Sequence, residues 1–244
     1  MIHSIKRLIG YRLAAVDGEI GHLKDFYFDD CEWTVRYAVA EAGSWLHSRQ
    51  VLLSPRAFGE IAYAGQRLHV ELSREQIKHS PPIDTHKPVS RQYEEEYHRY
   101  YGWPYYWQGA ALWGMSGFPI LHQRSEPFLG EQARVHRSGK KHGGSLRSVH
   151  VVSGYRVQAS HNVVGRLTDF LVDDESWAIQ SCVVDIGARL TGKRVLVLPA
   201  QIDHISWDTS TMHLNVPESI VVQAPAFNEI SLDESARERM TIFI

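Results

Sequence analysis

The stretch GYRLAAVDGEIGHLKDFYFDDCEWTVRYAV at residues 10–39 decides the fold, because it returns as GYRVQASHNVVGRLTDFLVDDESWAIQSCV at residues 154–183. The match extends without a gap from residues 10–84 to residues 154–228, and about 20 of the 75 aligned positions are identical. Such self-similarity is the signature of an internal repeat. The chain of 244 residues therefore contains two related copies, each of which can only just bury a core of its own.

The positions that the two copies share are mostly glycine, aromatic, apolar and turn residues. We take ten of them as the residues that define the structure of the repeat: Gly10, Gly21, Asp25, Asp29 and Trp33, with Gly154, Gly165, Asp169, Asp173 and Trp177 at the equivalent positions. Acids, bases and nucleophiles are few among the shared positions. The sequence therefore indicates the architecture more clearly than the chemistry.

Short apolar runs between turn residues predict six strands in each copy. In the first copy these are residues 11–16, 19–28, 34–42, 50–53, 60–63 and 67–72, followed by a short helix at 74–78. In the second copy they are residues 155–160, 163–172, 178–186, 194–198, 204–207 and 211–216. Many short strands without a long helix among them predict an all-β fold of two small antiparallel β-barrels in tandem.

The segment between the copies has a different character. A short helix is predicted over residues 90–101, because tyrosines recur there at helical spacing behind a serine cap. The extended aromatic stretch WPYYW follows at residues 103–107, since proline restricts the residue before it. Residues 136–145 are rich in Gly, Ser and basic residues and predict a flexible linker. Residues 233–240, at the end of the second copy, resemble a degenerate copy of the helix at 90–101.

We expect four parts along the chain: a first repeat at residues 1–84, a helical and aromatic connector with its linker at 85–145, a second repeat at 146–228 and a C-terminal tail at 229–244. The net charge of −2 argues against a broad basic face for nucleic acid or an anionic membrane. Cys31 and Cys182 are not at equivalent positions, so we expect free thiols. The sequence shows no signal peptide and no apolar run of membrane-spanning length, and we expect a cytoplasmic protein.

The ordered series of shared motifs resembles the PRC-barrel domain, a family named after the cytoplasmic part of the photosynthetic reaction centre H subunit. The series runs from Gly10-Tyr11-Arg12 through Asp17-Gly18, Gly21, Asp25-Phe26, Asp29-Asp30 and Trp33 to Val51-Leu52-Leu53 and Pro55. The resemblance covers both copies, roughly 150 of the 244 residues. The middle segment looks like the connector of stand-alone bacterial members that carry two copies.

The resemblance implies small β-barrels that serve protein–protein contact and have no active site of their own. In the H subunit such a barrel docks on membrane-embedded partners, and in a ribosome maturation factor it docks on a ribosomal protein. The sequence shows no counterpart of the membrane helix of the former or of the separate amino-terminal domain of the latter. Neither specific role is therefore carried over to this chain.

The acid pairs Asp29-Asp30 and Asp173-Asp174 have two interpretations. They could form a divalent-cation site or an acid–base pair, but an Asp before a hairpin turn more often accepts hydrogen bonds from the turn amides. Of the fourteen histidines only His69 and His213 recur at equivalent positions, and none has the spacing of a zinc site. We expect no metal and no cofactor.

Asp25 and Asp169 lie in the middle of a predicted strand, where a carboxylate is unusual. We expect each to accept hydrogen bonds from an arginine of its own copy, Arg12 or Arg156, or from backbone amides. The sequence contains neither a nucleophile elbow nor a phosphate-binding or dinucleotide-binding loop. We therefore expect a protein that is not an enzyme.

The aromatic residues of the connector are the candidates for an interaction site. Nine of the 21 residues between positions 93 and 113 are aromatic, and such side chains are favoured at interface hot spots. The candidates are Tyr93, Tyr97, Tyr101, Trp103, Tyr105, Tyr106, Trp107 and Trp113. Two interpretations stay open: the segment docks a partner, or it packs within the chain between the two barrels.

We expect a non-enzymatic PRC-barrel protein that acts as a protein–protein interaction or assembly module, forms a homodimer and has a partner that the sequence does not identify. One alternative is a ribosome-associated or RNA-associated maturation factor, which rests on the basic stretch at residues 134–147. Nucleic acid is otherwise not an expected partner. A second alternative is a peripheral accessory of a membrane complex of the photosynthetic type.

Overall fold

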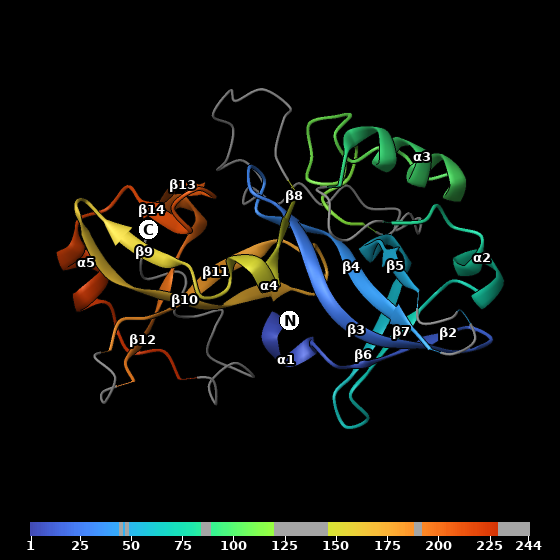
Figure 1. The fold of residues 1–244 in the computed structure, drawn as a ribbon, viewed down its shortest axis with the longest axis horizontal. Helices are drawn as coiled ribbons and strands as arrows, with labels where there is room; N and C mark the ends of the chain where they lie inside the picture. Colours follow the sequence, from blue (N-terminus) through green and yellow to red (C-terminus); the bar gives the residue numbers. More distant parts are fainter. Residues whose placement is uncertain (44–45, 47–48, 84–88, 120–145, 188–191, 229–244) are drawn as a thin grey trace. The chain divides into compact units, whose positions relative to one another are not determined.

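The computed structural model describes residues 1–43, 46, 49–83, 89–119, 146–187 and 192–228 (Figure 1). The chain divides into two compact units. The first-copy unit comprises Leu8–Leu146 and Glu175–Trp177, and the second-copy unit comprises Met1–Arg7, Arg147–Asp174 and Ala178–Ile244. The chain forms two seven-stranded sheets, so the predictions of a mainly β protein and of an internal repeat are confirmed.

The first-copy unit contains all six predicted strands and both predicted helices. The strands are β2 (Arg12–Ala15), β3 (Gly18–Asp29), β4 (Thr34–Ala42), β5 (Gln50–Leu53), β6 (Phe58–Ala62) and β7 (Arg67–Val70). The helices are α2 (Arg74–Lys78) and α3 (Arg91–Tyr101), and a 3₁₀ turn, η2 (Pro55–Ala57), joins β5 to β6. Ser90 caps α3 by accepting a hydrogen bond from the Tyr93 amide, and the helix ends at Gly102 in a left-handed conformation.

The strands of the first-copy sheet follow the order β5-β4-β3-β2-β7-β6, and a short strand, β8 (Leu146–Ser148), lies where the boundary between the two units falls in the chain. The long β3–β4 hairpin requires a glycine at position 21, because a Cβ atom there would lie 1.9 Å from the Glu41 carbonyl oxygen. Gly165 meets the same restriction, since its Cβ would lie 2.3 Å from the Asp185 carbonyl oxygen. Close approach of two backbones therefore explains why both copies carry this glycine.

The second-copy unit repeats the arrangement. Its strands are β9 (Arg156–Ala159), β10 (Asn162–Asp173), β11 (Ile179–Asp185), β12 (Arg194–Val197), β13 (Ile202–Ser206) and β14 (Thr211–Leu214), in the order β12-β11-β10-β9-β14-β13. The sequence did not predict the short elements α1 (Ile5–Leu8), α4 (Val149–Val152), η4 (Pro199–Gln201) and α5 (Glu218–Gln223). The helix expected at residues 233–240 and the linker at residues 136–145 lie outside the described residues.

The prediction of two antiparallel β-barrels is corrected by the strand pairing. Among the described residues, the strand paths end at β5 and β6 in one sheet and at β12 and β13 in the other, and these ends do not pair, so neither sheet is closed. Each sheet also contains one parallel pair, β2 with β7 and β9 with β14. The parallel pair has a local cause in the first copy, because the 3₁₀ turn η2 joins β5 to β6 without reversing the strand direction. The following β6–β7 hairpin therefore returns β7 parallel to β2.

Two short segments each belong to the unit of the other copy, not to the unit of the copy beside them in the sequence. β1 (Ile2–Ser4) precedes the first copy but pairs with β10 of the second, with Ile2 opposite Asp173. The turn Glu175–Trp177 follows β10 but belongs to the first-copy unit. There the Trp177 ring packs against Phe58, with ring centroids 4.9 Å apart. Each unit is thus completed by residues distant from it in the chain.

Candidate functional site

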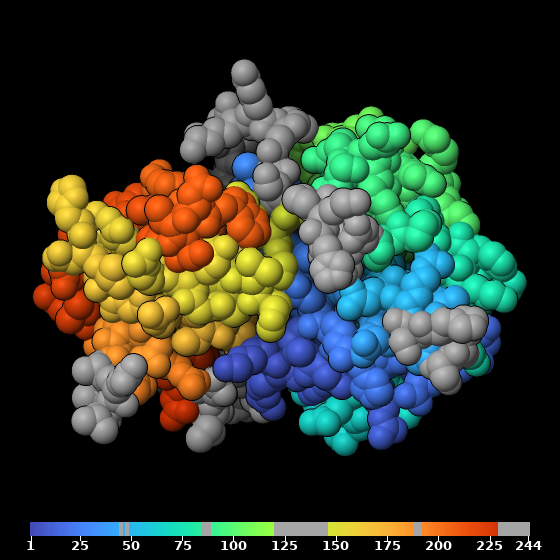
Figure 2. Space-filling view, in the orientation of Figure 1, coloured from blue at the N-terminus to red at the C-terminus, as the bar shows by residue number. Residues whose placement is uncertain are grey.

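The eight candidate aromatic residues lie on α3 and on the segment that follows it, which we call the aromatic cover (residues 93–113). In Figure 2 this part of the chain is green and lies at the surface of its unit beside residues coloured blue and cyan. Tyr97, Tyr106 and Trp113 are buried. Tyr93, Tyr101, Trp103, Tyr105 and Trp107 are half-buried. The structure therefore packs all eight against their own unit and leaves part of five of them accessible.

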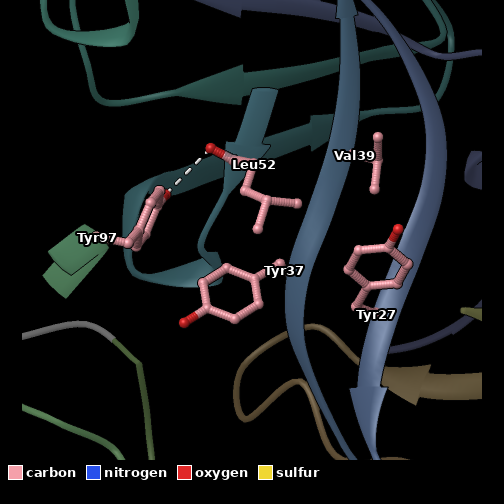
Figure 3. Close-up of a cluster of buried hydrophobic side chains, with 5 residues drawn as sticks. All are labelled: Tyr27, Tyr37, Val39, Leu52 and Tyr97. Atoms are coloured by element: carbon pink, nitrogen blue, oxygen red, sulfur yellow. Dashed lines mark hydrogen bonds between the residues drawn. The ribbon is translucent and has the colours of Figure 1, made fainter. Parts of the chain in front are cut away.

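Tyr97 fixes α3 to the sheet (Figure 3). Its ring meets the Tyr37 ring edge to face, with centroids 5.3 Å apart, in a buried cluster that also contains Tyr27, Val39 and Leu52. Its hydroxyl donates to the Leu52 carbonyl oxygen at 3.1 Å. Because β4 supplies Tyr37 and Val39 while β5 supplies Leu52, a single side chain holds the helix over two strands.

Two stacked ring pairs lie in the accessible part of the aromatic cover. Tyr101 and Trp103 stack with centroids 4.5 Å apart and an interplanar angle of 15°. Tyr105 and Trp107 stack at 4.7 Å and 16°. Stacked rings on a buried base lose little conformational freedom when they bind, which suits them to a contact surface.

Arg36 lies buried beneath the aromatic cover, with 1% of its surface exposed. Its guanidinium carbon is 4.0 Å from the centroid of the Tyr106 ring and 5.0 Å from that of Trp113. Nη1 donates to the Leu112 carbonyl oxygen at 2.6 Å, and Nη2 lies 3.6 Å from Asp29 Oδ2. The charge of Arg36 is thus matched by two ring faces, a carbonyl group and a carboxylate.

Trp113, at the end of the aromatic cover, is held from several sides. Its Nε1 donates to the Ser176 carbonyl oxygen at 2.7 Å, and its own carbonyl oxygen accepts from Arg56 Nη2 at 3.0 Å. Arg56 also donates to the Pro119 carbonyl oxygen at 3.0 Å. Burial and the neighbouring Arg36 lower the pKa of Arg56 to about 10, so this side chain stays a cation at neutral pH.

Glu94, on the buried face of α3, is almost completely enclosed, with 2% of its surface exposed. Its Oε1 accepts from the Tyr106 hydroxyl at 2.5 Å, and its Oε2 lies 3.0 Å from Arg91 Nη1. Burial raises the pKa of Glu94, and the hydrogen bonds from Tyr106 and Tyr37 and the positive charge of Arg91 partly offset this effect. The carboxyl group therefore links the helix, the aromatic cover and the sheet.

His98 lies on the same face of the helix and is equally buried. Its Nδ1 is 3.0 Å from the Pro104 carbonyl oxygen, which can only accept, so Nδ1 carries the proton. Burial, together with the positive charge of Arg56, lowers the pKa of His98 to about 4. The ring is therefore neutral at pH 7, and Nε2 is a hydrogen-bond acceptor.

The hydroxyl group of Tyr37 joins Glu94 to His98, since its oxygen lies 3.2 Å from both Glu94 Oε1 and His98 Nε2. One hydroxyl proton cannot serve a carboxylate and a neutral imidazole together. The hydroxyl donates its proton to Glu94 Oε1, and this bond is one of those that offset the effect of burial on the pKa of the carboxyl group. The buried carboxyl group and the buried ring are thus linked through one tyrosine.

The ten repeat-defining residues occupy turns, strand ends and buried strand positions. Gly10 and Gly154 have φ values of 89° and 96°, and Trp33 and Trp177 are buried turn residues with φ values of 47° and 58°. The remaining six, Gly21, Asp25, Asp29, Gly165, Asp169 and Asp173, lie on β3 or β10. None of these positions belongs to the aromatic cover, although Asp29 lies 3.6 Å from Arg36 beneath it.

Asp29 has the bonds expected of a turn residue. Its Oδ1 accepts from the amides of Cys31 and Glu32 at 2.9 and 3.2 Å. The potential ligand atoms of Asp29, Asp30 and Cys31 lie within 4.8 Å of one another. Because the Asp29 carboxylate is already engaged by two amides and faces Arg36, this group is better explained as a turn than as a cation site.

Asp169 fixes the N-terminal segment to the second-copy unit. Its carboxylate accepts from the Ser4 hydroxyl and from the Lys6 amide, the latter at 2.9 Å, as well as from its neighbour Phe170 at 2.7 Å. Asp25 likewise accepts from the amide of the next residue. The expectation of backbone donors is confirmed. Arg156, the alternative donor, instead donates to the Thr209 carbonyl oxygen.

Sequence reasoning missed the polar residues beneath the aromatic cover: Arg36, Tyr37, Arg56, Glu94 and His98. A signal was present in the comparison of the two copies. The second copy has Gln180, Ser181 and Ala200 where the first has Arg36, Tyr37 and Arg56. These three residues are particular to the first copy, and in the structure they lie beneath the cover.

No protein-family model matches the chain, and no curated protein is similar to it. Within the described part of the chain, no helix combines the length and the apolar character that crossing a bilayer requires. Cys31 is exposed and Cys182 is buried, and burial raises the pKa of the Cys182 thiol.

Proposed function

We propose that the protein is a non-enzymatic protein–protein interaction module, and that the aromatic cover of the first-copy unit is its docking surface. The observation that carries this proposal is a pair of accessible ring stacks on buried side chains. Tyr101 on Trp103 packs against the buried cluster around Tyr97. Tyr105 on Trp107 packs against the buried His98 and Tyr106. Tyr and Trp are the residue types most enriched at interface hot spots. A second copy of the chain is the partner that we expect first.

The groups beneath the aromatic cover support a structural role in preference to a catalytic one. Glu94 and His98 are buried and are bonded to Tyr37, Tyr106 and Pro104 of the same unit. A general acid or base must reach a substrate within hydrogen-bond distance. Groups that satisfy one another inside the protein instead hold the cover in a single position, which favours a preformed contact surface.

The resemblance to PRC-barrel domains agrees with a contact function, although the sheets of this chain are mixed and open. The alternatives stay predictions. The basic stretch that motivates an RNA-associated role lies almost entirely outside the described residues, and no observation favours the membrane-complex role. Homodimerisation and a cytoplasmic location are likewise proposals that rest on the sequence.

Sedimentation equilibrium of the full chain tests the proposal. We compare the wild type with the double variant Trp103→Ala/Trp107→Ala and with Trp207→Ala, a control at a half-exposed tryptophan of the second copy. A dimer that is weakened at least about tenfold by the double variant alone supports the proposal. Equal self-association of all three proteins contradicts docking through the cover. Thermal melting of each variant separates loss of binding from loss of the fold.

A further inference from the structure

Two histidines stack at the edge of the second-copy sheet. β13 ends the strand path, and its His204 lies directly opposite His213 of β14. The ring centroids are 4.4 Å apart and the rings are inclined by only 13°. The His204 side chain is 56% exposed. Two imidazoles therefore stand parallel on neighbouring strands with access to solvent.

A β-bulge brings a carboxylate to the same place. The register of β13 and β14 shifts between Ile202 and His204, so that Asp203 and His204 together oppose His213. Both bulge residues are exposed, where regular alternation would place one of them on the opposite face. The Asp203 Oδ2 atom lies 2.8 Å from His204 Nδ1. Bulges of this kind re-aim side chains next to functional sites.

The carboxylate prepares His204 for coordination. Its bond to Nδ1 places the ring proton there and leaves the lone pair of Nε2 available, which is the usual arrangement of a metal-ligating histidine.

A shared ion requires the two rings to turn out of their stack. Zn–N bonds of about 2.0–2.1 Å in tetrahedral geometry place two donor nitrogens roughly 3.4 Å apart. The ring centroids are 4.4 Å apart, and because the lone pairs of parallel rings do not converge, at least one ring must rotate about its side-chain torsions to bring a nitrogen of each ring to one ion. Exposure leaves room for water at the remaining coordination positions.

The first copy supplies a natural comparison. Its β6–β7 pair carries a register shift in the same region, between Phe58 and Ile61, but Gly59 and Glu60 stand where the second copy has Asp203 and His204. Only His69, the counterpart of His213, is shared. The bulge therefore belongs to the fold, whereas the second imidazole and its carboxylate are particular to the second copy.

We propose that His204 and His213 bind a Zn²⁺ ion through their imidazole nitrogens, with Asp203 as the positioning residue that orients His204. Water completes the coordination sphere. The site is independent of the aromatic cover and of the interaction function proposed for it.

Isothermal titration of the full chain with ZnCl₂ in a non-coordinating buffer tests the site. Since the chain has fourteen histidines, the readout is the difference between variants. His204→Ala and His213→Ala are expected each to remove one binding equivalent or to weaken it at least about tenfold, and Asp203→Asn to weaken it by about tenfold. His69→Ala, the matched control, is expected to titrate like the wild type.

Isotherms of His204→Ala and His213→Ala that superimpose on the wild type would overturn the proposal. Imidazole nitrogen spectra of the wild type under zinc titration provide a test that needs no substitution. Coordination shifts at both His204 and His213 support the site, even where a variant fails to fold. Shifts confined to other histidines overturn it.

Discussion

Replacing His98 changes how the stability of the protein depends on pH. The pKa of His98 is about 4 in the folded chain, against an ordinary value of 6.5. Between these two pH values the unfolded state therefore binds more protons than the folded state. The contribution of His98 to the free energy of unfolding is fully present above pH 6.5 and is lost as the pH falls toward 4. At about 1.4 kcal/mol per pH unit, the loss amounts to roughly 3 kcal/mol for this buried ring.

The assay is urea unfolding of the wild type and of His98→Gln at intervals from pH 4 to pH 7.5. Glu94 acts in the opposite direction, because its raised pKa gives stability below pH 4.5 that is lost as the pH rises through its folded pKa. Glu94 is present in both proteins, so the difference between them isolates the histidine. We expect the stability advantage of the wild type to shrink by about 3 kcal/mol on acidification. A difference that does not change with pH would refute the reasoning.

Three further changes test the packing. Gly21→Ala forces a Cβ against the backbone carbonyl of the neighbouring strand and is expected to lower the free energy of unfolding in urea by about 3 kcal/mol. Gly65→Ala, in open space, is the control and is expected to lower it by under about 1 kcal/mol. Equal losses would contradict the close approach at Gly21. Arg36→Met leaves its partners under the cover unpaired and lowers the unfolding free energy by about 3 kcal/mol, and an unchanged value refutes the buried pairing. Asp169→Asn weakens the bond from Ser4 and is expected to speed amide exchange in β1 by about tenfold, corresponding to roughly 1.4 kcal/mol; unchanged protection contradicts the anchor.

The strands were predictable because their signals are local. Alternating apolar residues and turn residues gave the six strands of each copy, and Ser90 with Gly102 bounded α3. The open, mixed sheets were not predictable, because one 3₁₀ turn at Pro55 decides whether the chain reverses between β5 and β6. Pairing of β1 with β10 joins residues more than 160 positions apart, and no local pattern encodes it.

The candidate site was predictable only in part. Density of aromatic residues pointed to the segment from Tyr93 to Trp113, and the structure places those rings together on one face of the first-copy unit. The polar layer beneath them was missed because Arg36 and Arg56 look like solvated charges in a sequence. Their burial depends on ring faces and carbonyl groups supplied by a segment about 60 to 80 residues further along the chain.

The most direct test of the aromatic cover as a docking surface is site-specific photo-cross-linking of the full chain in its native host. A photoreactive phenylalanine replaces Trp107 in one protein. In a second protein it replaces Tyr63, a half-exposed residue in the turn between β6 and β7, outside the aromatic cover. We predict a discrete protein adduct, to a second copy of the chain or to another protein, from position 107 and none from position 63. Absence of an adduct at position 107, or the same adducts at both positions, would contradict the account.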